Sequence, residues 1–381
     1  MKSLKQISVD PLVTPMQRAL ALARQALGTT SPNPAVGAVI VKEGAMIGEG
    51  YTLPTGQRHA EIGALEQAGA AAQAAELYTT LEPCCHFGRT PPCTDAIIAA
   101  GVKTVHLAII DPNPQVAGRG CAQLQAAGIQ VVVEDTQGAQ ELYEGFAKHI
   151  QSGIPFLTAK FAMSLDGKIA THTGDSKWVT GAASRRVVQE MRRECDAVLV
   201  GINTVLADDP QLTARDEGGS PLPRQPLRVV LDSRCRTPLD ARLLGEPGQA
   251  LIVTSQNASP ARIAELADRG AQVLPVPPNE QGRVDLPEIM AELGRRDVVN
   301  LLVEGGGIVL GSLFDAELVD KVYAFIAPKI IGGETAPTPV GGTGAPTMSR
   351  SCQLERTRWE QIGEDWLIIG YPVRGYPVPK G

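Results

Sequence analysis

The chain has 381 residues, which is enough for two or three domains. Hydrophobic residues make up 43% of it and charged residues 20%, as expected of ordinary globular domains. The formal net charge is −6, the sequence pI is about 5.5, and there is no long run of Lys or Arg. Because phosphate contacts carry much of the affinity for nucleic acids, this charge balance favours a small-molecule substrate over nucleic acid.

The N-terminal sequence and the cysteines predict a cytoplasmic protein without a membrane span. No apolar signal segment opens the chain, and no stretch approaches the length of a transmembrane helix. Cys84, Cys85 and Cys93 fall close together, whereas the other four of the seven cysteines are isolated. This distribution suits a metal site in a reducing compartment better than a set of disulfides.

The first half of the chain predicts strands that alternate with helices. Thr14 can cap a helix that starts at Pro15 and ends at Gly28. The segments that follow are a hairpin of strands 36–41 and 46–51, helix 59–72, strand 77–81, helix 95–100, strand 105–110, helix 121–127 and strand 129–133. This order predicts a layered α/β domain whose sheet is largely parallel after the hairpin.

A domain boundary is expected near residues 150–155, where Gly153 and Pro155 follow a helix. We therefore divide the chain into domains 1–150 and 151–381. In the second domain we expect strands 156–162, 197–200, 227–231, 250–253, 272–276, 300–303 and 321–326, with helices between several of them, such as 184–193. No internal repeat relates the halves, so they are expected to perform different reactions.

His59, Cys84 and Cys93 are the candidate ligands of a zinc ion, and Glu61 is the candidate acid/base residue beside it. Three protein ligands leave a fourth position for water, whose pKa zinc lowers to about 7. The H-x-E and P-C pattern is that of zinc-dependent nucleobase deaminases, in which the carboxylate moves protons. Residues two apart on a helix point about 200° apart, so this site requires zinc to lie at the helix mouth.

A structural zinc site is the alternative, with Cys85 or His86 as a fourth ligand. The eight residues between Cys84 and Cys93 are unlike the short spacing of paired cysteines in a zinc knuckle, which favours the catalytic site. Cys85 is then expected to be a small packed side chain, and His106, inside an apolar strand, a core residue.

Short motifs in both halves carry a family resemblance. In the first half they are Pro83-Cys-Cys-His-Phe-Gly-Arg-Thr-Pro-Pro-Cys93, His59-Ala-Glu61, Pro32-Asn-Pro-Ala-Val-Gly37 and Asp111-Pro-Asn113. In the second half they are Lys160-Phe-Ala-Met-Ser-Leu-Asp-Gly-Lys168, Ser176-Lys-Trp178, Thr204-Val-Leu-Ala-Asp-Asp-Pro210 and Val303-Glu-Gly-Gly306. Over nearly its whole length the chain resembles the bifunctional riboflavin-biosynthesis RibD family.

The resemblance implies a cytidine-deaminase-like three-layer domain followed by a dihydrofolate-reductase-like domain. It also implies two reactions. The first is hydrolytic deamination of a diaminopyrimidinone that carries a phosphoribosylamino side chain. The second is NADPH-dependent reduction of the ribosyl group to a ribityl chain. Zn²⁺ and NADPH are the implied cofactors, and a phosphorylated pyrimidine is the implied substrate.

For the first domain the resemblance implies that the substrate is bound by Asn33, His86, Arg89, Asp111 and Asn113. A planar guanidinium suits phosphate oxygens. The alternatives are turn stabilisation by His86 and Arg89, and an Asx turn around Pro112. One position departs from the family pattern, because Tyr51 is followed by Thr52 where the family has a histidine. The resemblance therefore implies that a substrate-contacting imidazole is missing at this position, while the zinc chemistry is intact.

For the second domain the resemblance implies that NADPH is bound by Ala162, Trp178, Thr204, Asp208, Ser233, Gly306 and Gly307. The substrate is implied to be bound by Ser176, Arg192, Leu212, Arg215 and Glu304. The glycines after Glu304 precede a helix-like segment, 308–314, whose N–H groups could hold a phosphate. Taken alone this cluster is weak evidence, since it lacks the full Rossmann glycine pattern.

Asp208 is the candidate for assisting proton transfer during the reduction. We further expect a homo-oligomer. The alternative function is a zinc-dependent nucleic-acid base deaminase with an accessory nucleotide-binding domain. That function would call for a basic groove and aromatic stacking residues, and the chain is acidic with only 4% aromatic residues.

Overall fold

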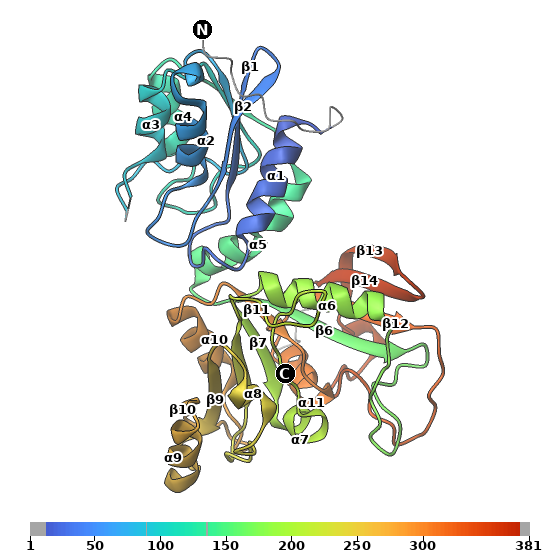
Figure 1. The fold of residues 1–381 in the computed structure, drawn as a ribbon. Helices are drawn as coiled ribbons and strands as arrows, with labels where there is room; N and C mark the ends of the chain where they lie inside the picture. Colours follow the sequence, from blue (N-terminus) through green and yellow to red (C-terminus); the bar gives the residue numbers. More distant parts are fainter. Residues whose placement is uncertain (1–12, 89, 135, 374–381) are drawn as a thin grey trace. The chain divides into compact units, whose positions relative to one another are not determined.

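The computed structural model describes residues 13–88, 90–134 and 136–373 (Figure 1). The chain forms two compact units that divide between Gly153 and Ile154. Each unit has its own sheet and its own buried core. Among the described residues, every helix is too short or too polar to cross a lipid bilayer.

The first unit contains a five-stranded sheet in the order β2-β1-β3-β4-β5. β1 is antiparallel to β2 and β3, and β3, β4 and β5 run parallel, as expected from the sequence. The strands are β1 (Gly37–Lys42), β2 (Ala45–Tyr51), β3 (Glu76–Thr79), β4 (Thr104–Leu107) and β5 (Gln130–Val133).

The helices of this unit pack on the sheet through close backbone approaches. They are α1 (Pro15–Ala26), α2 (Ala60–Ala68), the 3₁₀ helix η1 (Gly69–Ala72), α3 (Cys93–Ala99), α4 (Arg119–Ala126) and α5 (Gln137–Ser152). Thr14 caps α1 in a capping box with Gln17. A Cβ on Gly50 would lie 2.3 Å from the Ala60 carbonyl oxygen, so α2 can lie against β2 only because this residue is glycine.

The expected helix 59–72 is wrong at both ends. His59 is the N-cap of α2 and has an extended backbone, so the helix begins at Ala60. α2 ends at Ala68, because Gly69 has a φ of 53°, and a single 3₁₀ turn follows.

The second unit contains a nine-stranded sheet in the order β10-β9-β8-β7-β11-β6-β12-β14-β13. The strands from β10 to β12 are parallel, and β14 and β13 add an antiparallel edge. They are β6 (Phe156–Ser164), β7 (Ala197–Gly201), β8 (Leu227–Leu231), β9 (Ala250–Ser255), β10 (Gln272–Val276), β11 (Asn300–Val303), β12 (Lys321–Ala327), β13 (Leu354–Ile362) and β14 (Asp365–Pro372).

Alternate residues of the central strands enter two cores, one on each face of the sheet. Leu199 packs with α10 and α11 residues, whereas Val198 and Val200 pack with residues of α6, α7, α8 and α9. The helices are α6 (Ala182–Glu194), α7 (Ile202–Asp208), α8 (Arg242–Gly245), α9 (Pro260–Asp268), α10 (Leu286–Arg295) and α11 (Gly307–Asp315), with the 3₁₀ helix η2 (Met348–Arg350).

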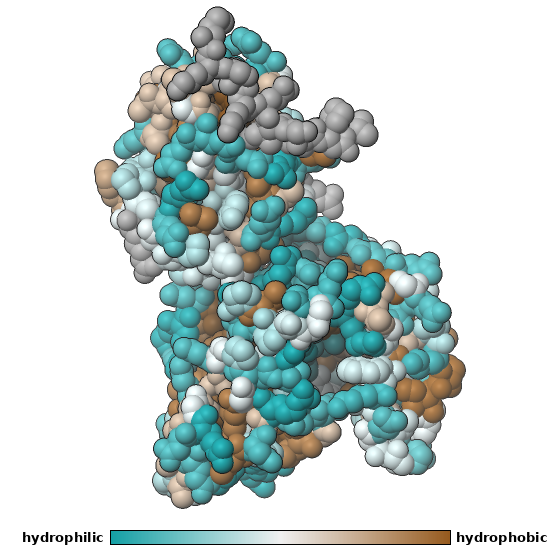
Figure 2. All heavy atoms as spheres, in the orientation of Figure 1, coloured by the Kyte–Doolittle hydropathy of each residue, from teal (hydrophilic) through white to brown (hydrophobic). Residues whose placement is uncertain are grey.

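The strands β13 and β14 were not predicted from the sequence. Almost every β13 side chain is exposed, including Trp359, so this strand lacks the alternation of a half-buried strand. The hairpin is tied to the rest of the unit by Asp365, which accepts hydrogen bonds from the Gly181 N–H and the Ser184 hydroxyl at the start of α6. Hydrophilic side chains cover most of the face drawn in Figure 2.

Candidate active sites

The N-terminus of α2 brings the side chains of His59 and Glu61 to the same site. Two residues at positions 59 and 61 of a helix would point in nearly opposite directions. His59 is the N-cap and has an extended backbone, so its ring is not held in that direction and can face the same site as Glu61. Cys84 follows β3 in an irregular turn, and Cys93 is the first residue of α3. The requirement that zinc lie at a helix mouth is therefore met by the backbone geometry.

His59, Cys84 and Cys93 present three metal-ligating atoms to one point. The His59 Nδ1 lies 3.6 Å from the Cys84 Sγ and 3.3 Å from the Cys93 Sγ, and all three atoms lie within 4.8 Å of one another. A tetrahedral zinc with ordinary Zn–N and Zn–S bonds separates such ligands by about 3.5 Å. The hydrogen bond from Cys93 and the neighbouring His59 lower the pKa of Cys84, and the same hydrogen bond raises the pKa of Cys93, so one thiolate is favoured in this pair. The donor set fits zinc.

A second contact orients the His59 ring. Its Nε2 lies 3.2 Å from the Thr90 hydroxyl. With Nδ1 on the metal, Nε2 carries the proton and donates to that hydroxyl, which is how metal-bound imidazoles are commonly held. The sequence analysis did not single out Thr90.

Glu61 is buried beside the three ligands. One of its carboxylate oxygens lies 3.6 Å from the Cys93 Sγ, and the side chain is almost inaccessible to solvent. Burial raises the pKa of Glu61 to about 7, which makes both its protonated and its ionised form accessible near neutral pH. This is the property required of a group that accepts a proton and then releases it.

Cys85 and His86 are not part of this donor group. Among the described residues, the group of metal-ligating side chains comprises His59, Cys84 and Cys93. Cys85 is partly exposed and His86 is exposed. Arg89 lies outside the described residues. The geometry therefore favours a site with three protein ligands over a closed structural site.

Asp111 and Asn113 form successive Asx turns on the loop after β4. The Asp111 carboxylate accepts the Asn113 N–H at 2.8 Å, and the Asn113 side chain accepts the Gln115 N–H at 3.0 Å. Burial raises the pKa of Asp111 to about 7. Asn33 is partly buried in the loop before β1, with its N–H bonded to the Thr30 carbonyl. Among the described residues, no hydrogen bond joins these three side chains to the zinc ligands.

In the second unit, several predicted cofactor residues lie at the carboxyl ends of parallel strands, where α/β proteins bind ligands. Ser233 follows β8, Thr204 lies in α7 directly after β7, and Gly306 caps α11 after β11. The Thr204 hydroxyl would lie 3.6 Å from a Cβ on Gly306, so these two residues are neighbours. The Thr338 carbonyl oxygen would lie 2.5 Å from a Cβ on Gly307, so this position must be glycine.

Of the other predicted cofactor residues, two lie on β6 and on the loop after it, and Asp208 is the last residue of α7. Ala162 lies in β6, and Trp178 is exposed with the Arg185 guanidinium 4.6 Å from its ring centre. Asp208 accepts a hydrogen bond from the Ser176 hydroxyl at 2.7 Å. A predicted cofactor residue and a predicted substrate residue are thus in direct contact.

Lys160, Arg192 and Glu304 form a buried charge cluster. Arg192 binds both carboxylate oxygens of Glu304 at 2.5 and 3.1 Å, and the Lys160 Nζ lies 3.5 Å from the same carboxylate. Burial alone would raise the pKa of Glu304, but Arg192 and Lys160 lower it to about 2. Two cations against one anion leave an excess positive charge that suits a phosphorylated ligand.

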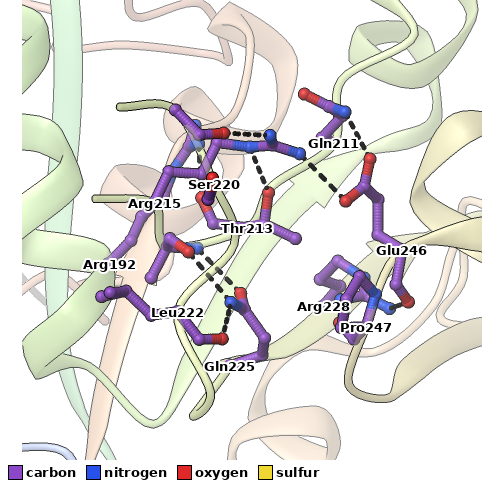
Figure 3. A network of polar contacts seen from close by, with 12 residues as sticks. Arg192, Gln211, Thr213, Arg215, Ser220, Leu222, Gln225, Arg228, Glu246 and Pro247 are labelled. Carbon is purple, nitrogen blue, oxygen red and sulfur yellow. Dashed lines mark hydrogen bonds and ion pairs between the residues drawn. The ribbon is translucent and has the colours of Figure 1, made fainter. Parts of the chain in front are cut away.

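Leu212 and Arg215 lie on an irregular segment between α7 and β8. Leu212 has a φ of 55° and its side chain is buried in the core, so only its backbone could contact a ligand. The Arg192 Nη1 donates to the Thr213 carbonyl at 3.2 Å, and the Thr213 hydroxyl accepts from the Arg215 Nε at 2.9 Å. Thr213 therefore connects the two arginines that are predicted to bind the substrate (Figure 3).

Comparison with known proteins gives the family. Residues 12–109 match the model of the cytidine and deoxycytidylate deaminase zinc-binding region, and residues 155–368 match that of the RibD C-terminal domain. The riboflavin biosynthesis protein RibD of Aquifex aeolicus is 44% identical over 93% of this chain and 96% of its own length. The chain belongs to the RibD family.

Solved structures of RibD proteins agree with this assignment. RibD of Acinetobacter baumannii (form 1) has a TM-score of 0.83 at 38% identity, covering 94% of this chain and 98% of that one. A Thermotoga maritima protein described as diaminohydroxyphosphoribosylaminopyrimidine deaminase/5-amino-6-(5-phosphoribosylamino)uracil reductase has a TM-score of 0.80 at 35% identity, with the same coverage.

This RibD chain is therefore a bifunctional enzyme of riboflavin biosynthesis, with a zinc-binding deaminase domain and a reductase domain. The expected fold class, cytidine-deaminase-like and then dihydrofolate-reductase-like, is confirmed.

The sequence analysis missed one carboxylate that organises the deaminase site. Glu82 is buried, and its side chain accepts hydrogen bonds from the N–H groups of Asp111, Gly118 and Cys121 at 2.9–3.1 Å. Glu82 thus links the turn that carries Cys84 to the loop that carries Asp111 and Asn113. A charged residue directly between a buried strand and Pro83 was the available signal, since a buried carboxylate needs several donors.

Proposed function

We propose that the first unit removes the 2-amino group of a diaminopyrimidinone carrying a phosphoribosylamino side chain, and that the second unit reduces the ribosyl group of the product with NADPH. The observation that carries the proposal is the convergence of His59, Cys84 and Cys93 with Glu61 beside them. The printed description of the Thermotoga maritima relative, which names both reactions, supports the choice of substrate.

In the deamination, His59, Cys84 and Cys93 would hold the metal. Zinc, when bound, supplies the Lewis acidity that lets water attack a pyrimidine carbon at neutral pH. Glu61 would accept a proton from the water and deliver it to the departing amine, so that ammonia leaves and a carbonyl replaces it. Its burial and raised pKa support this role.

Substrate recognition is proposed for Asn33, His86, Arg89, Asp111 and Asn113. Asn33 and His86 would contact the pyrimidine, and Arg89 the phosphate. Asp111 and Asn113 would contact the ring from the loop held by Glu82. Because a preformed loop loses little freedom on binding, the Glu82 contacts support this assignment.

In the reduction, NADPH would be bound by residues of β6 and the loop after it, of α7, and of the segments that follow β8 and β11. These are Ala162, Trp178, Thr204, Asp208, Ser233, Gly306 and Gly307. NADPH, when bound, supplies the hydride, so the protein mainly positions the sugar carbon against it. Asp208 would assist proton transfer through its hydrogen bond with Ser176.

The substrate of the reduction would be held by Ser176, Arg192, Leu212, Arg215 and Glu304. Arg192 and Arg215 would bind its phosphate, because guanidinium groups pair well with phosphate oxygens. The position of Thr213 between them supports this pairing.

A domain boundary near residues 150–155, a cytoplasmic location and a homo-oligomer complete the proposal. The seven cysteines are free thiols, which supports a reducing compartment. The exposed edge strand β13 supports self-association, because such edges readily pair with another chain.

One experiment tests the proposed pair of reactions. Purified protein is incubated with the diaminopyrimidinone, with and without NADPH, while ammonia and nicotinamide absorbance are followed separately. We expect ammonia release without NADPH, and NADPH oxidation only after deamination has begun. Oxidation of NADPH without prior ammonia release would contradict the proposed order and substrate.

A further inference from the structure

The guanidinium of Arg215 is held by three protein acceptors (Figure 3). Its Nε donates to the Thr213 hydroxyl at 2.9 Å, its Nη1 to the Gly219 carbonyl at 2.6 Å, and its Nη2 to Glu246 at 2.9 Å. Glu246 is the acidic member of this set, and both side chains of the ion pair are largely buried. Arg215 has five N–H groups, so two remain for a ligand.

Glu246 is itself fixed at both its side chain and its backbone. Its second carboxylate oxygen accepts a hydrogen bond from the Gln211 amide. Its carbonyl, and those of Pro247 and Gly248, accept hydrogen bonds from Arg228, a buried side chain of β8. The loop from α8 to β9 is therefore anchored to the sheet at the point where it carries Glu246 (Figure 3).

The backbone that carries Arg215 is fixed from the other side. Gln225 exchanges hydrogen bonds with the N–H and the carbonyl of Ala214, each at 2.9 Å, and the Gln189 side chain accepts the Arg215 N–H at 3.0 Å. This segment has no regular secondary structure, so hydrogen bonds from side chains take the place of the backbone hydrogen bonds that a strand or helix would provide.

We propose that Glu246 is a positioning residue of the reductase site, which sets the orientation of Arg215 toward the substrate's phosphate. The proposal rests on the proposed function, in which Arg215 binds that phosphate. Glu246 touches neither cofactor nor reacting carbon; it acts through the guanidinium. An arginine side chain that is not held in place samples several rotamers and loses this conformational entropy when it binds a ligand. When Glu246 already fixes one rotamer, substrate binding no longer carries that entropy cost.

The experiment compares the phosphorylated substrate of the reduction with its dephosphorylated form in steady-state kinetics with NADPH. The variants are Glu246→Ala, Glu246→Gln and Arg215→Gln. The matched control is Glu265→Gln, since Glu265 forms an exposed ion pair with Arg262 on α9. Thermal unfolding of each variant accompanies the kinetics.

We expect Glu246→Ala to raise the KM for the phosphorylated substrate on the order of tenfold and Glu246→Gln about threefold, because glutamine keeps one acceptor oxygen. kcat and the KM for NADPH stay unchanged. With the dephosphorylated substrate, kcat/KM of the Glu246 variants equals that of the wild type. A merely structural role would instead lower kcat/KM for both substrates, and that result would overturn the proposal.

The two assignments fail in different ways. If Arg215→Gln raises the KM for the phosphorylated substrate and Glu246→Ala does not, the positioning role is wrong and the phosphate-binding role of Arg215 stands. If Arg215→Gln leaves that KM unchanged, the phosphate-binding role is wrong, and the positioning role is wrong with it.

Discussion

The Thr52 hydroxyl accepts a hydrogen bond from the Val36 N–H at 3.1 Å, and the Thr52 N–H donates to the Val36 carbonyl at 2.9 Å. The two residues thus continue the β1–β2 pairing by one step beyond Tyr51. Thr52 is buried, and its hydroxyl satisfies a backbone group that would otherwise lack a partner. The residue that departs from the family pattern therefore has a structural function.

We predict that Thr52→His lowers the free energy of unfolding by about 1–3 kcal/mol, because a larger ring must fit a packed position. Chemical denaturation measures this change. Thr52→Ser keeps the hydroxyl and should cost less, about 1 kcal/mol. A histidine variant that is as stable as the wild type and has a lower KM for the pyrimidine would mean that position 52 opens onto the substrate.

We predict that Glu61→Gln retains zinc and loses ammonia release by at least about 100-fold, since the amide cannot move a proton. NADPH oxidation on supplied deaminated substrate should continue at the wild-type rate, because the second unit has its own core. Glu66→Gln is the matched control, since Glu66 lies on the same helix in an exposed ion pair with Arg58. Near wild-type deamination by Glu61→Gln would refute the assignment.

We predict one zinc per chain in the wild type and in Cys85→Ser, and none or little in Cys93→Ser. The reason is that the Cys93 Sγ belongs to the donor group and Cys85 does not. Elemental analysis of purified protein measures the metal, and ammonia release should follow it. Equal zinc loss in both serine variants would indicate that Cys85 is a ligand.

We predict that ionised Glu304 makes the free energy of unfolding depend on pH in the acid range. Its pKa falls from an ordinary 4.5 to about 2 in the folded chain. Its stabilisation is therefore complete above pH 4.5 and is lost as the pH falls toward 2. We expect the difference in unfolding free energy between the wild type and Glu304→Gln to shrink by roughly 1–2 kcal/mol between pH 7 and pH 3.5. A difference independent of pH would show that Glu304 is not held ionised by Arg192 and Lys160.

The zinc ligands could be predicted from sequence because residue type and order carry the chemistry. His59, Cys84 and Cys93 stand in a spacing that few other sites share. Whether the side chains of His59 and Glu61 can face the same zinc could not be predicted from the sequence, since it depends on whether position 59 is helical. The extended backbone of His59 decides it.

The alternating strands and helices of both units were predictable because their core residues follow regular periods. β13 was not, since its side chains are exposed and its order comes from pairing with β14. Glu82 and Glu246 were missed for a related reason. Each acts on groups far away in the chain, and no local pattern marks such contacts.

The three hydrogen bonds that the Glu82 side chain accepts from backbone amides have a thermodynamic consequence. The amides of Asp111, Gly118 and Cys121 all donate to the Glu82 carboxylate, so we expect the loop after β4 and the start of α4 to open as a single cooperative unit and not residue by residue. Hydrogen exchange at these three amides should therefore proceed at one common free energy of opening. The segment that carries the proposed substrate residues Asp111 and Asn113 would then be ordered before a ligand arrives.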